Sequence, residues 1–335
     1  MVAQVDKEYT NYGYGKLVRR LISYTFFEGR QHTTKGQWFN PVVFLILRIL
    51  KSLPGYPKLV QPIFITGLGR SGTTILGVLL SLHKDVGFLN EPKAIWRTID
   101  KKNDVNGDFV PSGGIFRLNK NDANEIARRT GHRIFSRYLS TVRAKRLVDK
   151  YPELIFRVEY LLELFPDAKI VFISRNGINA THSIDLWSKR LGVNVNGRVD
   201  DWWGRGDIKW TNLREQIIQQ DQYYQSVRQV ADKNLDHLNR AALEWIITMR
   251  EGLKSIKDHP ESVIHIQYEK LTQSPEKEMR HLLTQCNLAN DNTVINYSIK
   301  KLYTNKTKEK PILQPPIQIL FDETMIELGY QTGNI

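Results

Sequence analysis

The sequence predicts an α/β protein with a P-loop-like, three-layer fold, in which helices cover both faces of a central parallel sheet and extra helical segments are added. Three short apolar runs, at 62–66, 169–174 and 262–267, each lead through a turn into a helical pattern. Strands buried on both faces read as continuous apolar runs, and parallel neighbours need crossover connections, which are usually helices. The first run passes directly into a glycine-rich turn, which is the P-loop-like feature.

The remaining elements follow in order along the chain. Residues 1–58 are predicted as an N-terminal helical arm, which ends at 53–57 because two prolines and a glycine interrupt it. Residues 59–335 are predicted as one domain that holds the sheet. Within it we expect a helix at 75–82, a strand at 86–89, a helix at 178–189, helices within 212–258 with a break at 234–239, a helix from about residue 275, and a loop at 300–316.

The composition is that of an ordinary globular protein. The 335 residues include 48 Lys and Arg against 35 Asp and Glu, a formal net charge of +13, and 41% are apolar, which excludes wholesale disorder. Cys286 is the only cysteine, so neither an intrachain disulfide nor a cysteine-based metal cluster can form. Because we find no apolar leader and no apolar stretch long enough to span a bilayer, we expect a cytoplasmic protein.

The positive charge is concentrated in two regions. Residues 1–60 carry nine basic and three acidic side chains, and residues 117–146 carry nine and two. Such an excess of positive charge can bind nucleic acid, an anionic membrane surface or a small polyanionic ligand. Because no continuous basic tract occurs, we expect no nucleic-acid partner. The N-terminal arm, with its apolar segment 41–50, is a candidate for peripheral membrane contact, and an arm packed on the main domain is the alternative.

The glycine-rich turn at 67–74 is a candidate phosphate site. It reads Gly-Leu-Gly-Arg-Ser-Gly-Thr-Thr and lies between the first strand and a helix. Successive backbone N–H groups in such a turn, together with the positive end of the helix dipole, bind anions. The spacing is close to the Walker A pattern, but Thr73 stands where the lysine belongs, and the cation is Arg70. Nucleoside triphosphatases need that lysine, so the sequence argues against triphosphate hydrolysis.

A second candidate phosphate site follows the strand at 169–174. Arg175 ends this strand, and Ser183 comes eight residues later on the next helix. A guanidinium and a hydroxyl that converge at a strand–helix junction can hold one phosphate from two sides. Either residue alone is ordinary, but two phosphate motifs in this order predict a ligand that carries phosphate at two ends.

Together these motifs resemble those of the sulfotransferases that use 3′-phosphoadenosine 5′-phosphosulfate (PAPS) as sulfuryl donor. The resemblance implies that the phosphosulfate is held by Arg70, Ser71, Gly72, Thr73 and Thr74. It also assigns the 3′-phosphate to Arg175 and Ser183, and it places Tyr268, after the third strand, near the nucleotide. The resemblance covers roughly residues 60–290 and implies a sulfotransferase domain. No metal is expected to be required if Lys and Arg side chains supply the positive charge for the reaction.

Sulfuryl transfer to a hydroxyl needs a base for the proton and positive charge for the leaving phosphate. For the base, the resemblance favours Glu91, which follows the strand at 86–89 and lies 21 residues after Arg70, as in tyrosylprotein and related carbohydrate sulfotransferases. For the cation it favours Lys150, in a Lys-x-Pro segment 25 residues before Arg175. Arg70 is expected to assist Lys150.

Histidine is the alternative base, as in the aryl and steroid sulfotransferases, but the Lys-Thr context of their histidine is absent here. His83 is expected at the end of the first helix, in a structural role. His132 lies in the basic region, where we expect a solvated side chain. His182, next to Ser183, is the best placed histidine, although packing is the expected role for it as well.

The acceptor is the least determined part of the prediction. Trp202, Trp203 and Trp210 could stack on a sugar or aromatic acceptor, or they could fill the core. Lys306 and Lys308 lie in the loop that the resemblance expects to close over the donor. The predicted reaction moves a sulfuryl group from PAPS to a hydroxyl of a carbohydrate, lipid or other small molecule. A P-loop kinase-like phosphotransferase is the first alternative, and a basic membrane- or nucleic-acid-binding module is the second.

Overall fold

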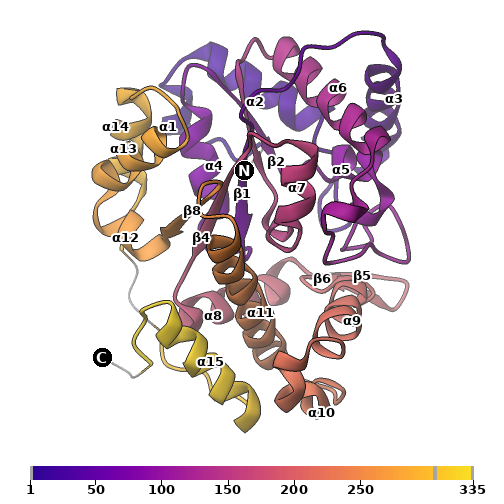
Figure 1. Cartoon of the computed structure of the whole chain (residues 1–335), viewed down its shortest axis with the longest axis vertical. Coiled ribbons are helices and arrows are strands. Elements are labelled where there is room, and N and C mark those ends of the chain that lie inside the picture. Colours follow the sequence, from indigo (N-terminus) through magenta and orange to yellow (C-terminus); the bar gives the residue numbers. More distant parts are fainter. Residues whose placement is uncertain (1–2, 305–307, 333–335) are drawn as a thin grey trace.

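A five-stranded parallel sheet forms the centre of the computed structural model, which describes residues 3–304 and 308–332. Its strands lie in the order β2–β3–β1–β4–β8, and all neighbours pair in parallel. The strands are β1 (Ile63–Gly67), β2 (Val86–Asn90), β3 (Arg146–Lys150), β4 (Lys169–Ser174) and β8 (Val263–Gln267). Figure 1 shows this sheet in the middle of the molecule, with helices on both sides. The predicted α/β fold around a central parallel sheet is confirmed.

The strands end at a common edge. Asn90 of β2 and Ile65 of β1 both pair with Lys150, the last residue of β3. On the other side of β1, Gly67 pairs with Ile173 of β4. In an open parallel sheet, the loops beyond the carboxyl ends of the strands form the usual binding crevice. The register therefore brings the segments after all five strands into one region.

Alternate residues of each strand face opposite layers, as the pleat of a strand requires. Ile63 and Ile65 of β1 belong to one apolar cluster, and Phe64 belongs to the other. The smaller cluster is completed by α4 (Thr73–Ser81), α13 (Pro275–Gln285) and α14 (Asn292–Lys301). The larger one is completed by α5 (Lys93–Ile99), α6 (Glu125–Thr141), α7 (Val158–Leu164), α8 (Gly177–Leu191), α11 (His237–Asp258) and α15 (Pro315–Glu327).

In the described part of the chain, three α-helices precede the sheet, namely α1 (Lys7–Thr10), α2 (Tyr14–Phe26) and α3 (Asn40–Ser52). The segment after α2 is tied to the end of β2, because Glu28 accepts a hydrogen bond from the Asn90 N–H at 2.7 Å. Glu28 also forms a buried ion pair with Arg20. The division of the chain at residue 58 stays a prediction. Within the described ranges, no helix has both the length and the hydropathy needed to cross a membrane.

The residues between α8 and α11 add a small antiparallel sheet and several short helices. The strands β5 (Val193–Val195), β6 (Arg198–Asp201) and β7 (Gly204–Arg205) pair in that order. They are followed by α9 (Ile208–Leu213), a π-helical turn at Arg214–Ile218, a 3₁₀ helix at Gln222–Val227 and α10 (Arg228–Ala231). The other short helices are Gln37–Phe39, Lys101–Asn103, Lys120–Asp122, Pro152–Arg157 and α12 (Tyr268–Gln273).

The structure differs from the sequence prediction in four places. The small antiparallel sheet within 193–205 is not predicted. The sequence does not predict β3, because charged residues interrupt its apolar pattern, yet Asp149 and Lys150 are both buried there. The helical region 212–258 is more broken than expected, with a 3₁₀ and a π segment before α11. Finally, α15 begins inside the predicted loop 300–316, at Pro315.

Candidate active site

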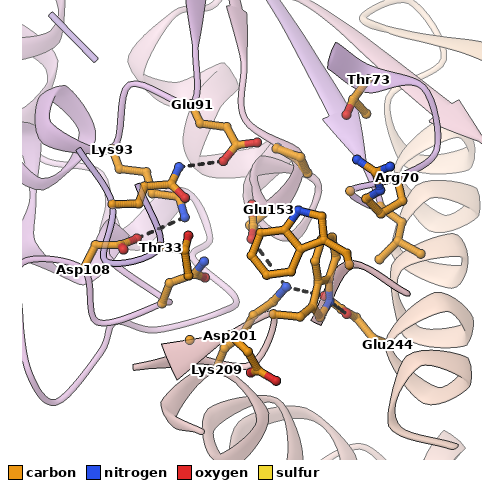
Figure 2. Close-up of a pocket in the computed structure, with 18 of the residues that line it drawn as sticks. Thr33, Arg70, Thr73, Glu91, Lys93, Asp108, Glu153, Asp201, Lys209 and Glu244 are labelled. Atoms are coloured by element: carbon orange, nitrogen blue, oxygen red, sulfur yellow. Dashed lines mark hydrogen bonds and ion pairs between the residues drawn. The ribbon is translucent and has the colours of Figure 1, made fainter. Parts of the chain in front are cut away.

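A cavity of about 190 Å³ lies at the carboxyl edge of the main sheet. Its walls come from the loop after β1, the turn after β2, the segment 31–33 that precedes α3, the inserted segment 200–209, and α11 (Figure 2). These segments are far apart in the sequence. The segments after β1 and β2 meet because the carboxyl ends of parallel strands lie together at one edge of the sheet, and the other three segments pack over that edge.

The turn between β1 and α4 has the backbone of an anion-binding loop. Arg70 and Gly72 adopt left-handed conformations, with φ of +72° and +92°. The first N–H groups of α4 have no acceptor within the helix, so they remain available to an anion. A side chain at Gly72 would clash, since its Cβ would lie 2.3 Å from the ring of Tyr268. The Ser71 hydroxyl is buried and has no hydrogen-bond partner among the described residues.

The two predicted phosphate motifs meet beside this loop. Arg70 donates from Nε to the Ser183 hydroxyl at 3.2 Å, and the Arg175 guanidinium donates to the Arg70 carbonyl at 2.5 Å. Burial lowers the pKa of Arg70, and the positive charges of Arg175 and Arg190 lower it further. A bound anion would relieve this repulsion between guanidinium groups.

Tyr268 follows β8 and covers the same corner of the site. Its ring lies against Gly72 and is centred 4.8 Å from the Arg175 guanidinium. Such a cation–π contact orients the guanidinium plane. The fold therefore brings Tyr268 to both phosphate motifs, while its contact with a nucleotide stays a prediction.

Glu91 and Lys150 lie at the ends of neighbouring strands and form an ion pair. Lys150 is buried, and its ammonium donates to Glu91 Oε1. The Glu91 backbone adopts a left-handed φ of +49°, a strained conformation that often marks functional positions. Burial would raise the pKa of Glu91, but Lys150, Lys93 and the hydrogen bond from Gln31 together lower it to about 2. The carboxylate is therefore ionised at neutral pH, as a proton acceptor must be.

Residues that the sequence prediction did not single out complete the surroundings of Glu91. Gln31 donates to Glu91 Oε2 at 2.7 Å. Lys93 is buried and forms an ion pair with Asp108 at 3.1 Å; burial would lower the pKa of Lys93, but Asp108 and Glu153 raise it. Figure 2 shows Glu91, Lys93 and Asp108 on the side of the cavity opposite Arg70 and Thr73. Lys93 lies two residues after Glu91, so the sequence could have predicted that it lies nearby. Gln31 and Asp108 are far from Glu91 or separated from it by other elements, and only the fold brings them close.

The inserted segment supplies the third wall of the cavity. The Trp202 indole donates to Glu244 at 2.5 Å and packs edge-on against Trp187, with ring centroids 5.4 Å apart. Lys209 lies 4.6 Å from the centre of the Trp202 ring and forms an ion pair with Glu244 at 2.5 Å. These contacts hold the Trp202 ring in one orientation at the cavity.

The three predicted tryptophans divide between the cavity and the core. Trp202 lines the cavity and also contacts the phosphate loop, where a Cβ at Gly69 would lie 2.5 Å from its ring. Trp203 and Trp210 are buried and pack against each other, with ring centroids 5.7 Å apart. For these two residues the core alternative is correct: Trp203 lies in the turn between β6 and β7, Trp210 lies in α9, and both side chains are buried.

The three histidines weighed as alternative bases hold structural positions. The expectation of a solvated His132 is wrong: the ring is buried, accepts the Leu59 N–H at 3.1 Å, and lies 3.2 Å from the Leu164 carbonyl. Its face of α6 packs on the core, so burial lowers the pKa of His132. His83 and His182 each bond to a main-chain carbonyl. None of the three lines the cavity among the described residues.

A different histidine, His32, does line the cavity. Its Nδ1 lies 3.9 Å from Asp200 Oδ2, and its Nε2 is buried with no hydrogen-bond partner among residues 3–304 and 308–332. Its backbone N–H donates to Asp108 at 3.0 Å. The geometry thus makes His32, next to Gln31, the alternative proton acceptor in the cavity.

The predicted closing loop is only partly described. Lys306 lies outside the described residues. The Lys308 N–H donates to the Asn179 side chain of α8 at 3.1 Å, which holds this part of the loop one turn from Ser183. In the described ranges, no group of three or more His, Cys, Asp or Glu side chains is arranged to hold a metal ion.

Residues 62–225 match the model of a family described as the sulfotransferase family. This region belongs to the sulfotransferase family. The match runs from β1 past the small antiparallel sheet, so it contains the phosphate loop, Glu91, Lys150, Arg175 and Ser183. The family that the sequence motifs resemble is therefore confirmed. The N-terminal arm and the residues after 225 lie outside the match.

Curated relatives match this chain over short segments. The nodulation protein NoeE of Sinorhizobium fredii is 29% identical over 119 residues, which are 34% of this chain and 28% of that protein. A protein-tyrosine sulfotransferase of Drosophila melanogaster is 31% identical over 139 residues, 38% of this chain and 26% of that protein. The chain thus matches only about a quarter of the length of these relatives. Among solved structures, the sulfotransferase domain from the curacin biosynthetic pathway aligns with 83% of this chain and 100% of that domain, at 14% identity and a TM-score of 0.49.

Proposed function

We propose that the protein transfers a sulfuryl group from PAPS to a hydroxyl of an acceptor. The observation that carries the proposal is the position of Arg70. It contacts Ser183 and Arg175 of the second phosphate motif, and it lines the same cavity as Glu91. A donor held by both phosphate motifs would therefore present its reacting end to an ionised carboxylate. Membership of residues 62–225 in the sulfotransferase family supports this reaction class.

The residues present fit a donor with phosphate at two ends. Ser71, whose hydroxyl is buried without a partner in the described part of the chain, would bind the phosphosulfate together with the first N–H groups of α4. Arg175 and Ser183 would bind the 3′-phosphate, with Tyr268 orienting Arg175. When bound, PAPS supplies an activated sulfuryl group whose leaving group is a phosphate. The positive charge of Arg70 suits that leaving group.

Glu91 is the proposed proton acceptor, and Lys150 is the proposed source of positive charge for the leaving phosphate. While the two side chains are paired, Glu91 is ionised but is a weak base, because its pKa is low. An anion in the phosphate loop competes with Glu91 for the Lys150 charge, so donor binding would raise the basicity of Glu91. Loss of one such charge stabiliser typically lowers a rate by about 100- to 1,000-fold.

The cavity lining favours an acceptor without negative charge. Six carboxylates and four Lys or Arg side chains line it, although the whole chain carries a net charge of +13. The carboxylates other than Glu91 are Asp108, Glu153, Asp200, Asp201 and Glu244. Carboxylates can accept hydrogen bonds from sugar hydroxyls, and an indole such as Trp202 can stack on a sugar ring. We therefore infer a carbohydrate hydroxyl, free or attached to a lipid, as the acceptor; a tyrosine hydroxyl is the alternative.

The donor site is tested by calorimetry with adenosine 3′,5′-bisphosphate and with adenosine 5′-phosphate. We expect the wild-type chain to bind the bisphosphate more tightly. Arg175→Ala should lower the affinity for the bisphosphate by about tenfold or more, because a charge-assisted contact to the 3′-phosphate is lost. The affinity for adenosine 5′-phosphate should fall much less. No binding of the bisphosphate, or equal losses for both ligands, would remove the basis of the proposal.

The reaction is tested by incubating the protein with PAPS labelled in its sulfuryl group and an extract separated into glycan, lipid and protein pools. We expect label in the glycan or lipid pool, and we expect transfer to continue in the presence of a metal chelator. Label confined to the protein pool would favour a tyrosine acceptor. Phosphate transfer from ATP that requires magnesium, without sulfuryl transfer, would favour the phosphotransferase alternative.

A further inference from the structure

One side of α3 carries a row of exposed apolar side chains. Trp38, just before the helix, is 82% exposed, and Leu45 and Ile49 are 57% and 51% exposed. Val42 and Leu53 are less exposed, at 40% and 43%. The five positions are separated by four, three, four and four residues, a spacing that places side chains along one face of a helix. We call these five residues the apolar row of α3.

The opposite face of α3 packs against the core of the protein. Val43 and Leu47 are fully buried in the larger apolar cluster, and Phe44 and Leu50 are partly buried against it. Through this face α3 packs on α5 and α6. Figure 1 shows α3 at the outer edge of the molecule, at the upper right, next to α6. The apolar row therefore adds nothing to the core, and a contiguous exposed apolar surface of this kind marks an interaction site.

The segment that contains the row is basic and nearly free of carboxylates. Residues 9–60 include eight Lys and Arg and one carboxylate, Glu28. Glu28 is buried in its ion pair with Arg20, so it does not neutralise the surface. Arg48 and Lys51 of α3 are both exposed.

Two arginines of α6 add positive charge at the end of the row. Arg133 donates to the Lys51 carbonyl at 3.0 Å, and Arg137 donates to the Leu53 carbonyl at 3.0 Å. Both guanidinium groups are thereby held at the C-terminal end of α3. The row is thus bordered by cations on α3 and on α6.

We propose that the apolar row of α3 docks on the surface of a membrane that contains anionic lipids. An apolar stripe bordered by Lys and Arg, with a tryptophan at one end, is the pattern of helices that lie in the plane of a membrane interface. Apolar burial and attraction to anionic headgroups act together in such binding. A second copy of this chain suits the surface less well, because it would bring two basic surfaces together without carboxylates to pair with them.

The docking surface is joined to the candidate active site by a short segment. Residues 31–33 line the cavity, and Gln31 bonds to Glu91; Trp38, the first residue of the row, follows five positions after Thr33. The docking surface lies outside the region that matches the sulfotransferase family. The membrane proposal therefore does not depend on the proposed reaction, and each can fail without the other.

The test is sedimentation of the full chain with vesicles of phosphatidylcholine alone or of phosphatidylcholine with phosphatidylglycerol. We expect binding to the anionic vesicles only. The double variant Leu45→Ser, Ile49→Ser should lose this binding. The matched control is the double variant Ile319→Ser, Ile326→Ser on α15. These two side chains are 61% and 66% exposed and also lie on one face of their helix. The control should bind as the wild type does.

The charge requirement is tested with Arg48→Gln and Lys51→Gln. A cation near an anionic membrane surface contributes enough that each substitution should weaken binding by about fivefold. Binding of the wild type should also weaken as the salt concentration rises, because the attraction is screened. Equal binding to neutral and anionic vesicles would overturn the requirement for anionic lipid.

Insertion is followed with an environment-sensitive dye attached through Leu45→Cys, and through Ile326→Cys as control. Labelling is selective because Cys286 is buried. We expect a blue shift of the dye at position 45 on addition of anionic vesicles and none at position 326. No vesicle binding, equal loss of binding in the two Ser double variants, or a dimer that dissociates in the Leu45→Ser, Ile49→Ser variant without vesicle binding would overturn the proposal.

Discussion

Three side chains act on the carboxylate of Glu91. Lys150 comes from β3, Gln31 from the N-terminal arm, and Lys93 from the first turn of α5. The first two contact its carboxylate oxygens, and all three lower its pKa. A carboxylate fixed in this way loses little entropy in reaching a reactive geometry, which favours a catalytic role over a structural one.

Replacing Glu91 by glutamine tests that role with little change in shape. Glu91→Gln keeps one acceptor oxygen, which can face Lys150, and its amide NH2 can donate to the amide oxygen of a rotated Gln31 side chain. The amide cannot take a proton at neutral pH. We expect sulfuryl transfer to fall by about 100- to 10,000-fold, while affinity for adenosine 3′,5′-bisphosphate changes little in calorimetry. Glu163→Gln, at an exposed position of α7, is the matched control. Turnover retained in Glu91→Gln but lost in His32→Gln would move the base to His32.

The hydrogen bond from Gln31 predicts a change in pH dependence. Gln31 lowers the pKa of Glu91, so Gln31→Leu should raise it. Glu91 accepts a proton only when ionised, and activity is therefore lost as the pH falls through its pKa. In Gln31→Leu the acidic limb of the kcat/KM profile should move to higher pH, and kcat should fall by about tenfold. Gln222→Leu, at an exposed glutamine, should change neither; a loss of kcat without a shifted limb would indicate a purely structural role for Gln31.

At the scale of elements, every main strand delivers a candidate residue at its carboxyl end. Glu91 follows β2, Lys150 ends β3, Arg175 follows β4 and Tyr268 follows β8, while the phosphate loop follows β1. This arrangement requires a close approach between the phosphate loop and α12. Gly72 makes that approach possible, because it has no side chain and tolerates a positive φ.

The close approach at Gly72 predicts the effect of a single methyl group. Gly72→Ala places a Cβ 2.3 Å from the Tyr268 ring at a φ of +92°. We expect a lower melting temperature and a loss of bisphosphate affinity of about tenfold or more, since ring and loop must separate. Gly329→Ala is the matched control, because Gly329 has a φ of +78° but open space around it. It should cost about 1–2 kcal/mol of stability and leave affinity unchanged. Equal effects of both variants on affinity would contradict the steric explanation.

At the scale of the whole molecule, the charge is divided unevenly. The chain carries a net charge of +13, and cations surround the second phosphate motif and the apolar row of α3. Carboxylates nevertheless outnumber cations in the lining of the cavity. A fold that separates charge in this way can attract an anionic donor to one part of the site and disfavour an anionic acceptor in another.

This division of charge predicts selectivity between acceptors. A neutral oligosaccharide should have a higher kcat/KM than the same chain with a uronic acid next to the reacting sugar. Asp201→Asn should raise kcat/KM for the acidic acceptor by about threefold or more, because it removes one repulsive charge. Asp258→Asn, at an exposed position away from this cavity, should have no effect. A preference of the wild type for the acidic acceptor would contradict the inference.

The parallel sheet, the phosphate loop and the Arg175–Ser183 motif could be predicted from the residues, and the resemblance to the sulfotransferases singled out Glu91 and Lys150. These features are readable because continuous apolar strands, positive-φ glycines and fixed short spacings are local properties. The strand β3 was not predicted, because charged residues such as Asp149 and Lys150 normally indicate an exposed segment. Both side chains are buried in the folded protein.

The set of distant side chains that share the cavity could not be predicted before the fold was known. Gln31 and His32 come from the arm, and Lys209 and Glu244 from beyond the middle of the chain, with no spacing that links them to Glu91. Likewise, Trp202 and Trp203 are adjacent in sequence, yet one lines the cavity and the other is buried in the core. The physical reason is that burial and charge pairing depend on the packing of segments far apart in the chain, and local sequence does not encode it.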